Sequence, residues 1–260
     1  MKLLHSVAVV GVPFRDGQRD LKRLKKLVTH HRPKLYLLSP VLHNPTGTTI
    51  QSSEAFELLS ILRTAGVYVV EDDVYADFVE MPMPRLTALS GHKGVAYVSS
   101  FSKTMSGGLR CGFVSAEPEI IKRITDLILG SSFGINSLTS IVVHKLLQSG
   151  LYRRNLKVLQ NSITQMRWDT LRRLRNLGFD IPVEPAGGVF IWARWSGAAD
   201  AAAISEIALK REILLAIGPS FSPSGDYGQY IRFNCTLMQN EVLWQQLRET
   251  LDKAEAAALK

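Results

Sequence analysis

The stretch "YVSSFSKTMSGGLRCGFV", Tyr97 to Val114, decides how the rest of this chain is interpreted. It begins as an apolar strand, becomes polar around one lysine, Lys103, and then returns to an apolar run. A lysine buried without a partner costs free energy, so this segment is either solvated or gives Lys103 a role. The other polar segments of the chain are needed to choose between these two interpretations.

The composition is typical of a soluble globular protein with one large or two moderate domains: 260 residues, 46% hydrophobic and 21% charged. No apolar run approaches the roughly 18 residues that span a bilayer. Near the N-terminus, Pro13 and Arg15 follow a short apolar run, which indicates a strand and not a signal peptide. Cys111 and Cys235 lack CxxC spacing, so we expect a cytoplasmic protein with neither a disulfide framework nor a metal site.

The net charge of +8 raises the question of nucleic-acid binding. Its densest source is the segment 18–34, where leucines recur at helical spacing and basic residues take the remaining positions. This pattern favours a solvated helix face over a nucleic-acid contact.

Short apolar strands alternate with amphipathic helices over the first part of the chain. The predicted strands and helices occupy residues 6–13, 20–31, 34–40, 52–66, 67–73, 94–100 and 109–116. A Ser cap is expected to open the helix at 52–66, and Gly66 to close it. Apolar strands separated by helices predict an α/β fold, with a mostly parallel sheet sandwiched by helices.

The order of predicted strands and helices changes after a long predicted helix at 151–177. Two strands around a Gly-rich turn, a helix, a strand and a terminal helix follow it, which indicates a small α+β domain. We therefore predict a large domain over 1–150, and a bridging helix with a small C-terminal domain over 151–260.

Four polar motifs follow predicted strands or lie within one. They are "HNPTG" at 43–47, "EDDVY" at 71–75, "SFSK" at 100–103 and Arg232 in "IRFNC". Each alone is compatible with an ordinary turn, helix cap, loop or surface arginine. Together and in this order they favour a binding site, because ligands of open α/β sheets bind at the carboxyl ends of the strands.

Pyridoxal phosphate chemistry requires all four kinds of group. A lysine amine forms a Schiff base with the cofactor's aldehyde, and a carboxylate keeps the pyridine nitrogen protonated. Hydroxyls and an arginine hold the phosphate. A second arginine suits the carboxylate of an amino-acid substrate, since its planar fork binds both oxygens.

At these motifs the sequence resembles the fold type I pyridoxal-phosphate enzymes, the class I/II aminotransferases. Within them it is most similar to the aminotransferase-like domain of MocR-type regulators in the GntR superfamily, and to aminoadipate and kynurenine-type transaminases. The resemblance extends over essentially all 260 residues. The combination of "NPTG", "DDVY", "SFSK…GLR" and "RFN" carries it.

The resemblance implies three catalytic residues. Lys103 would be the Schiff-base lysine, and Asp72 would be the partner of the pyridine nitrogen. Tyr75 would hold the ring's phenolic oxygen. Some MocR-type domains leave only one residue between aspartate and tyrosine, which favours Asp73 instead, so that assignment stays open.

The resemblance also implies the binding residues. Asn44 would hold the phenolic oxygen and contact the substrate, while Ser100, Ser102 and Arg110 would bind the phosphate. Arg232 would bind the substrate carboxylate. Gly107-Gly108 are expected to let the backbone turn so that Arg110 points back at the phosphate. His43 precedes Asn44 as in some aminotransferases, although a packed core histidine fits equally well.

The resemblance begins late, which predicts an N-terminally truncated family member. Family members carry a preceding segment with the phosphate-cupping loop and the aromatic residue that stacks on the ring; MocR-type regulators add a winged helix-turn-helix. We therefore expect weak cofactor retention and poor packing of residues 1 to about 15. The strands between Leu35 and Val114 should keep their order, because they pair with one another.

The resemblance implies amino-group transfer between an amino acid and a 2-oxo acid, by a homodimer. The segment "SSFGINSLTS" at 131–140 would lie near the dimer interface; a capped helix start fits it as well. The alternative is a cofactor-binding effector domain of a regulator with little or no turnover, which would reach DNA only through its winged helix. A nicotinamide-dependent enzyme is disfavoured because G-x-G-x-x-G is absent.

Overall fold

The structure, a computed structural model, describes residues 7–15, 17–79, 83 and 85–259. The chain forms two compact units. One comprises residues 31–165 and 185–188, and is called the sheet unit below; the other comprises residues 1–30, 166–184 and 189–260, and is called the terminal unit. The two units divide helix α6 (Leu151–Asn176) between Gln165 and Met166. The predicted division into domains 1–150 and 151–260 stays a prediction.

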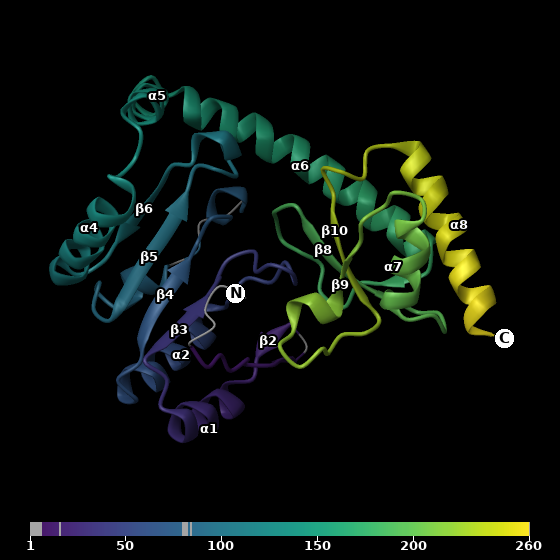
Figure 1. Ribbon diagram of the computed structural model, residues 1–260, viewed down its shortest axis with the longest axis horizontal. Coiled ribbons are helices and arrows are strands. Elements are labelled where there is room, and N and C mark those ends of the chain that lie inside the picture. Colours follow the sequence, from purple (N-terminus) through teal and green to yellow (C-terminus); the bar gives the residue numbers. More distant parts are fainter. Residues whose placement is uncertain (1–6, 16, 80–82, 84, 260) are drawn as a thin grey trace. The chain divides into compact units, whose positions relative to one another are not determined.

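The sheet unit is built on four strands in the order β3-β4-β5-β6 (Figure 1). Their bounds are Leu35–Leu38, Tyr68–Asp72, Val95–Ser100 and Gly112–Ser115. β3, β4 and β5 run parallel, whereas β6 is antiparallel to β5. The predicted mostly parallel sheet and the predicted strand order are both confirmed.

One face of this sheet is closed by helices α2 (Ser52–Thr64) and α3 (Leu86–Leu89). Leu58 and Leu62 of α2 and Leu86 of α3 are fully buried, and each contributes about 1.5–3 kcal/mol by leaving water. Gln51 precedes α2 without a side-chain cap bond, so the predicted Ser cap is wrong. Gly66 follows the helix with a φ of +68°, the left-handed conformation in which glycine commonly ends a helix.

The outer strands of the sheet are incompletely covered. Leu35 and Leu37 of β3 are 54% and 57% exposed, and Phe113 of β6 is also exposed. Among the described residues, no strand pairs with the outer edge of β3 or of β6. Unpaired edges beside exposed apolar side chains favour association with further polypeptide.

Helices α4 (Pro118–Ser132) and α5 (Ser137–Gln148) complete the sheet unit with the first part of α6. α4 lies along the β6 side of the sheet (Figure 1), where Tyr68 donates to Glu117 just before the helix. Asn136 caps α5 by accepting from the Leu138 N–H, so the segment 131–140 contains a capped helix start.

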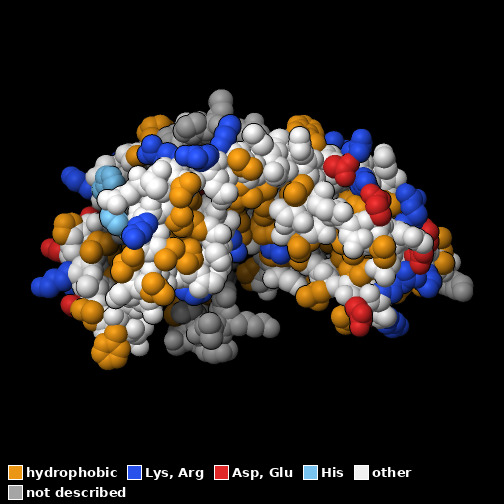
Figure 2. Space-filling view, turned by 90° about the horizontal axis from the view of Figure 1, so that it is seen from above, with side chains coloured by type: hydrophobic (Ala, Val, Ile, Leu, Met, Phe, Trp, Pro, Cys, Tyr) orange, Lys and Arg blue, Asp and Glu red, His pale blue; other side chains and the backbone are white. Residues whose placement is uncertain are grey.

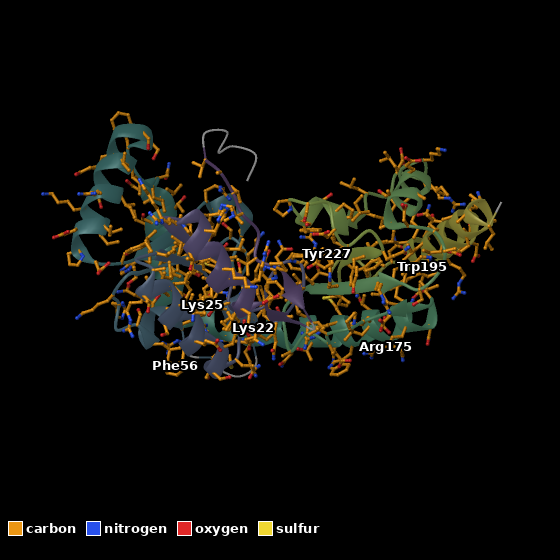
Figure 3. The ribbon with its side chains drawn as sticks, turned by 90° about the horizontal axis from the view of Figure 1, so that it is seen from below. Lys22, Lys25, Phe56, Arg175, Trp195 and Tyr227 are labelled. Carbon is orange, nitrogen blue, oxygen red and sulfur yellow. The ribbon has the colours of Figure 1, made fainter. Side chains whose placement is uncertain are left out.

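The terminal unit contains a second sheet in the order β7-β8-β10-β9. The bounds are Phe179–Asp180, Phe190–Trp195, Tyr230–Asn234 and Ala216–Ile217. Helices α7 (Ala201–Leu209) and α8 (Glu241–Ala258) pack with it. The two predicted strands around the Gly-rich turn, β7 and β8, are confirmed, and Trp195 of β8 is labelled in Figure 3.

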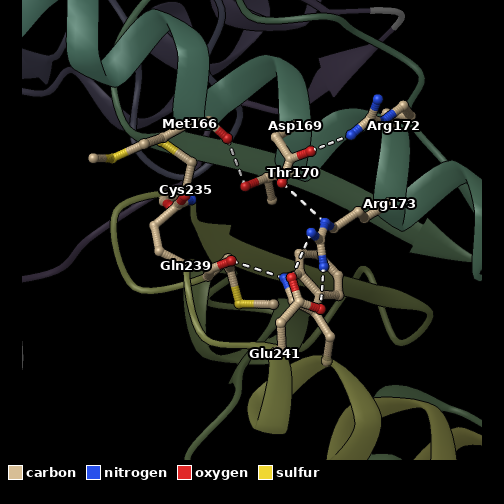
Figure 4. Close-up of polar contacts among 10 residues, drawn as sticks. Met166, Asp169, Thr170, Arg172, Arg173, Cys235, Gln239 and Glu241 are labelled. Atoms are coloured by element: carbon tan, nitrogen blue, oxygen red, sulfur yellow. Dashed lines mark hydrogen bonds and ion pairs between the residues drawn. The ribbon is translucent and has the colours of Figure 1, made fainter.

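An arginine fork joins α6 to α8 within the terminal unit (Figure 4). Arg173 donates to both carboxylate oxygens of Glu241, at 2.8 and 2.6 Å, and pairs with Asp169 at 2.9 Å. The Arg173 guanidinium thereby lowers the pKa of the Glu241 carboxyl. A bidentate contact of this type fixes the relative orientation of two helices better than a single lysine contact does.

The basic helix α1 (Leu21–His31) has the solvated face that its sequence predicts. Leu24 and Val28 are buried, while Lys22 and Lys25 are exposed (Figure 3). In the view of Figure 2, Lys and Arg side chains lie at several places on the surface, among hydrophobic, uncharged and acidic groups. Among the described helices, none is long and apolar enough to cross a membrane.

Residues 7–13 do not form the strand predicted at 6–13, and residue 6 lies outside the described residues. Val7, Val9 and Val10 are about half exposed, so the expected poor packing is confirmed for this segment. A short hairpin forms instead from β1 (Phe14–Arg15) and β2 (Gln18–Arg19). A strand needs a partner edge, and no described strand pairs with these valines.

Candidate active site

The predicted site residues of the sheet unit gather where its strands end. Asp72 is the last residue of β4, and Tyr75 follows in the next turn. Ser100 ends β5, and Ser102 and Lys103 lie in the turn at 101–105. The Lys103 Nζ lies 5.8 Å from the centre of the Tyr75 ring. This arrangement places an exposed amine beside a phenol at the carboxyl edge of parallel strands.

The strand register separates the two neighbouring aspartates. Asp72 pairs with Val98, and Ser100 lies two residues further along β5, so Asp72 and Ser100 share one face of the sheet. Asp73 follows Asp72 directly and points to the opposite face, where it forms an ion pair with Arg85. Asp73 is almost fully buried, whereas Asp72 is only partly so.

The two aspartates also differ in their surroundings. Burial raises the pKa of Asp72, and the N–H of Val74 lowers it by donating to Oδ1 at 3.4 Å. Burial raises the pKa of Asp73 to about 6, against the opposing effect of Arg85. Asp73 therefore forms a structural ion pair with Arg85, while the Asp72 carboxylate lies on the same face of the sheet as Ser100.

The pKa of Asp73 predicts a pH-dependent stability. Because its folded pKa of about 6 exceeds the ordinary value of 3.8, the folded state binds the extra proton, and stability rises as pH falls through 6. Between pH 7 and pH 5 this contributes about 1 kcal/mol to the free energy of unfolding. Urea unfolding of Asp73→Asn should lack this increment relative to the wild type. If the free energy of unfolding changes equally with pH in the wild type and in Asp73→Asn, this prediction is wrong.

The serines order the backbone before Lys103. Ser100 Oγ donates to the Cys111 carbonyl at 3.0 Å and accepts from the Ser102 N–H at 3.0 Å. The two serine hydroxyls are also hydrogen-bonded, at 2.9 Å. Gly112 lets β6 approach β5 closely at this point, since a Cβ at position 112 would lie 2.8 Å from the Ser99 carbonyl oxygen.

The segment after the Lys103 turn contains one left-handed residue, Arg110. Neither Gly107 nor Gly108 has a positive φ, whereas Arg110 itself is left-handed, with a φ of 49°. The glycine pair lies in the short 3₁₀ helix Gly107–Leu109, and Arg110 follows it in the left-handed conformation. The role of the pair in directing Arg110 toward the phosphate stays a prediction. The Arg110 side chain is exposed.

Asn44 lies in a compact turn after β3. His43 accepts the Gly47 N–H at 2.6 Å through its carbonyl, and the His43 N–H donates to the Thr48 carbonyl at 2.8 Å. Its ring Nδ1 is hydrogen-bonded to Thr46 Oγ1 at 2.9 Å. His43 is half-buried and stabilises the turn that carries Asn44.

Arg232 lies on β10 in the terminal unit. Its guanidinium carbon is 4.2 Å from the centre of the Phe190 ring and 5.1 Å from that of Phe221. Two aromatic rings at these distances hold the planar fork by cation–π contacts. The group is therefore oriented before any carboxylate binds.

Three polar residues of the sheet unit have structural roles that the sequence motifs do not predict. Glu71 is fully buried on β4 and accepts hydrogen bonds from the start of α3. Tyr152 of α6 and Asp77 are hydrogen-bonded to each other beside the Lys103 turn. All of these contacts join residues at least 15 positions apart in the chain, so no local pattern predicts them.

The fold and the strand-end residues define an aminotransferase domain, and the chain belongs to the family of class I and II aminotransferases, which matches residues 4–248. It is 29% identical to the 2-aminoadipate transaminase of Thermus thermophilus, over 91% of this chain and 61% of the transaminase. It is 28% identical to the HTH-type transcriptional regulator YisV of Bacillus subtilis, over 90% of this chain and 50% of the regulator.

Solved structures show the same fold. LysN, the α-aminoadipate aminotransferase of Thermus thermophilus, complexed with N-(5'-phosphopyridoxyl)-L-leucine, superimposes with a TM-score of 0.84 at 26% identity. That match covers 96% of this chain and 66% of LysN. The kynurenine aminotransferase of Pyrococcus horikoshii gives a TM-score of 0.86 at 22% identity, over 96% of this chain and 64% of the enzyme. The chain spans about half to two thirds of the length of these relatives.

Proposed function

We propose that this chain binds pyridoxal phosphate and serves amino-group transfer between an amino acid and a 2-oxo acid. The observation that carries the proposal is the position of Lys103 in the turn after β5, with Nζ 5.8 Å from the Tyr75 ring centre, beside the face shared by Asp72 and Ser100. Membership of the aminotransferase family supports it.

The groups at this site suit the cofactor chemically. Lys103 supplies the amine that would hold the cofactor's aldehyde, and Asp72 supplies a carboxylate for the pyridine nitrogen. Tyr75 and Asn44 supply donors for the phenolic oxygen. The phosphate would take the hydroxyls of Ser100 and Ser102, together with the guanidinium of Arg110. When bound, pyridoxal phosphate withdraws electrons from the substrate's reacting carbon.

We assign the pyridine-nitrogen role to Asp72 rather than Asp73. Asp72 shares a sheet face with Ser100, the proposed phosphate ligand, whereas Asp73 faces the other way and is paired with Arg85. A carboxylate already neutralised by an arginine is a weaker partner for a protonated ring nitrogen.

Arg232 is proposed to bind the substrate carboxylate. Phe190 and Phe221 both contact its guanidinium, which lowers the entropy lost when the planar fork closes on a carboxylate. This supports amino acids and 2-oxo acids as the substrate class, because both carry that group.

A second function, a cofactor-binding effector domain of a transcriptional regulator, is supported by the match to YisV over half of that regulator's length. In this case turnover is low, and DNA is bound by a winged helix-turn-helix outside the 260 residues. The sheet unit would use the same lysine and strand ends for sensing.

A homodimer is proposed from the apolar surface of α4 and α5. Phe133 is 91% exposed between these helices, and Leu127 and Leu138 are also exposed. Burial of such residues against a second copy would remove them from water.

A transamination screen separates the two functions. The chain is incubated with excess pyridoxal phosphate, a 2-oxo acid, and acidic, aromatic, basic or aliphatic amino acids in turn. We expect cofactor-dependent formation of the new amino acid from at least one class. Attachment of the cofactor without turnover of any class would favour the effector domain, and absence of both would contradict the proposal.

A further inference from the structure

The turn that carries Lys103 is held from both sides by one residue of another element. Tyr152, near the start of α6, packs its ring edge-on against Phe101, at 5.9 Å between ring centres. Its hydroxyl is hydrogen-bonded to Thr104 Oγ1 at 3.1 Å. Phe101 and Thr104 flank Lys103 within the turn, and Thr104 is only 3% exposed.

The direction of these hydrogen bonds follows from the number of protons. A phenol has one hydrogen to donate, and the Asp77 carboxylate can only accept. Tyr152 therefore donates to Asp77 Oδ2, and the Thr104 hydroxyl donates to the Tyr152 oxygen. Burial and the bond to Asp77 raise the pKa of Tyr152 to about 12, so the phenol keeps its proton.

The same network reaches the segment that follows Tyr75. Asp77 belongs to the short 3₁₀ helix η1 (Ala76–Phe78), which begins directly after Tyr75. Gln160 of α6 donates to the Asp77 carbonyl at 2.6 Å, which gives this helix a second attachment to η1. α6 thus holds both segments that carry the proposed cofactor ligands Lys103 and Tyr75.

We propose that Tyr152 is a positioning residue for Lys103, acting through Thr104 and Asp77; this inference rests on the proposed function. Lys103 is exposed and lies in a turn, so the position of its amine depends on the anchoring of that turn. The hydroxyl of Tyr152 is the group that joins the turn to the segment after Tyr75. Without it, the amine and the Tyr75 ring are no longer held in one arrangement.

The test compares Tyr152→Phe with Tyr68→Phe. Both remove one phenol that is hydrogen-bonded to a carboxylate in the sheet unit, but Tyr68 pairs with Glu117, before α4. Two quantities are measured: the rate at which pyridoxal phosphate attaches to Lys103, and the amide hydrogen exchange of residues 101–105. In Tyr152→Phe we expect attachment about tenfold slower and exchange about fivefold faster, with neither change in Tyr68→Phe.

Two replacements of Asp77 test whether the attachment rate can be restored. Asp77→Ala removes the acceptor and should behave like Tyr152→Phe, whereas Asp77→Asn keeps a carbonyl oxygen for the phenol and should restore most of the attachment rate. Unchanged attachment in Tyr152→Phe, or equal slowing in Tyr152→Phe and Tyr68→Phe, would overturn the positioning role. If the wild type does not attach the cofactor, the proposed function fails. The exchange of residues 101–105 then decides alone whether Tyr152 orders the turn.

Discussion

Replacing Lys103 with alanine is expected to abolish covalent attachment of pyridoxal phosphate to this chain. The wild type, incubated with excess cofactor, reduced with borohydride and digested, should give one main adduct on the peptide that contains Lys103. The physical reason is the position of the amine 5.8 Å from the Tyr75 ring centre, in the turn that also carries Ser102, where the proposed site would hold the aldehyde and the phosphate together. Mass spectrometry of the digest measures the occupancy.

The matched control is Lys93→Ala. Lys93 is exposed in the loop that precedes β5, in the same unit, but at the opposite end of that strand from Lys103. Its removal should leave the adduct unchanged. The assignment of Lys103 is wrong if Lys103→Ala retains an adduct of equal occupancy, or if the wild-type label is spread over surface lysines such as Lys22 and Lys25.

Replacing Glu71 with alanine is expected to destabilise the sheet unit by about 4 kcal/mol, because a buried network of charged hydrogen bonds is lost. Glu71 Oε1 accepts from the Leu86 N–H at 2.8 Å, and Oε2 accepts from the Thr87 N–H at 2.9 Å and the Thr87 hydroxyl at 2.6 Å. These N–H groups start α3 and have no partner within that helix. Without Glu71 they remain buried and unpaired.

The two free cysteines allow the units to be followed separately. Cys111 is buried in the sheet unit and Cys235 in the terminal unit, so thiol labelling at increasing urea reports each one. In Glu71→Ala the labelling midpoint of Cys111 should fall well below that of the wild type. Mass spectrometry of the cysteine peptides gives both midpoints.

Two variants control this experiment. Glu71→Gln keeps the shape and one accepting oxygen, so it should lose less stability than Glu71→Ala. Glu57→Ala removes an exposed carboxylate of α2 and should shift the Cys111 midpoint little. An unchanged Cys111 midpoint in Glu71→Ala would show that the cap of α3 contributes little to this unit.

The strand-end motifs were predictable because they are local. "EDDVY" and "SFSK" each begin within the last residues of an apolar strand, so the sequence itself puts Asp72, Tyr75 and Lys103 at or just after strand ends. The strands between Leu35 and Val114 were predictable for the same reason, since each is a short apolar run bounded by polar or turn residues. The strand at 6–13 was not, because its apolar pattern has no partner edge among the described residues.

Other properties depended on pairing across the chain. Adjacent residues of any strand face opposite sides, but only the register of β4 with β5 decides that Asp72, and not Asp73, shares a face with Ser100. The cap of α3 by Glu71 and the bond of Tyr152 to Asp77 join residues 15 and 75 positions apart. The sequence by itself determined which chemical groups the site contains. The tertiary structure decided which face each group occupies and what holds it, because hydrogen bonds between distant segments exist only after the chain has folded.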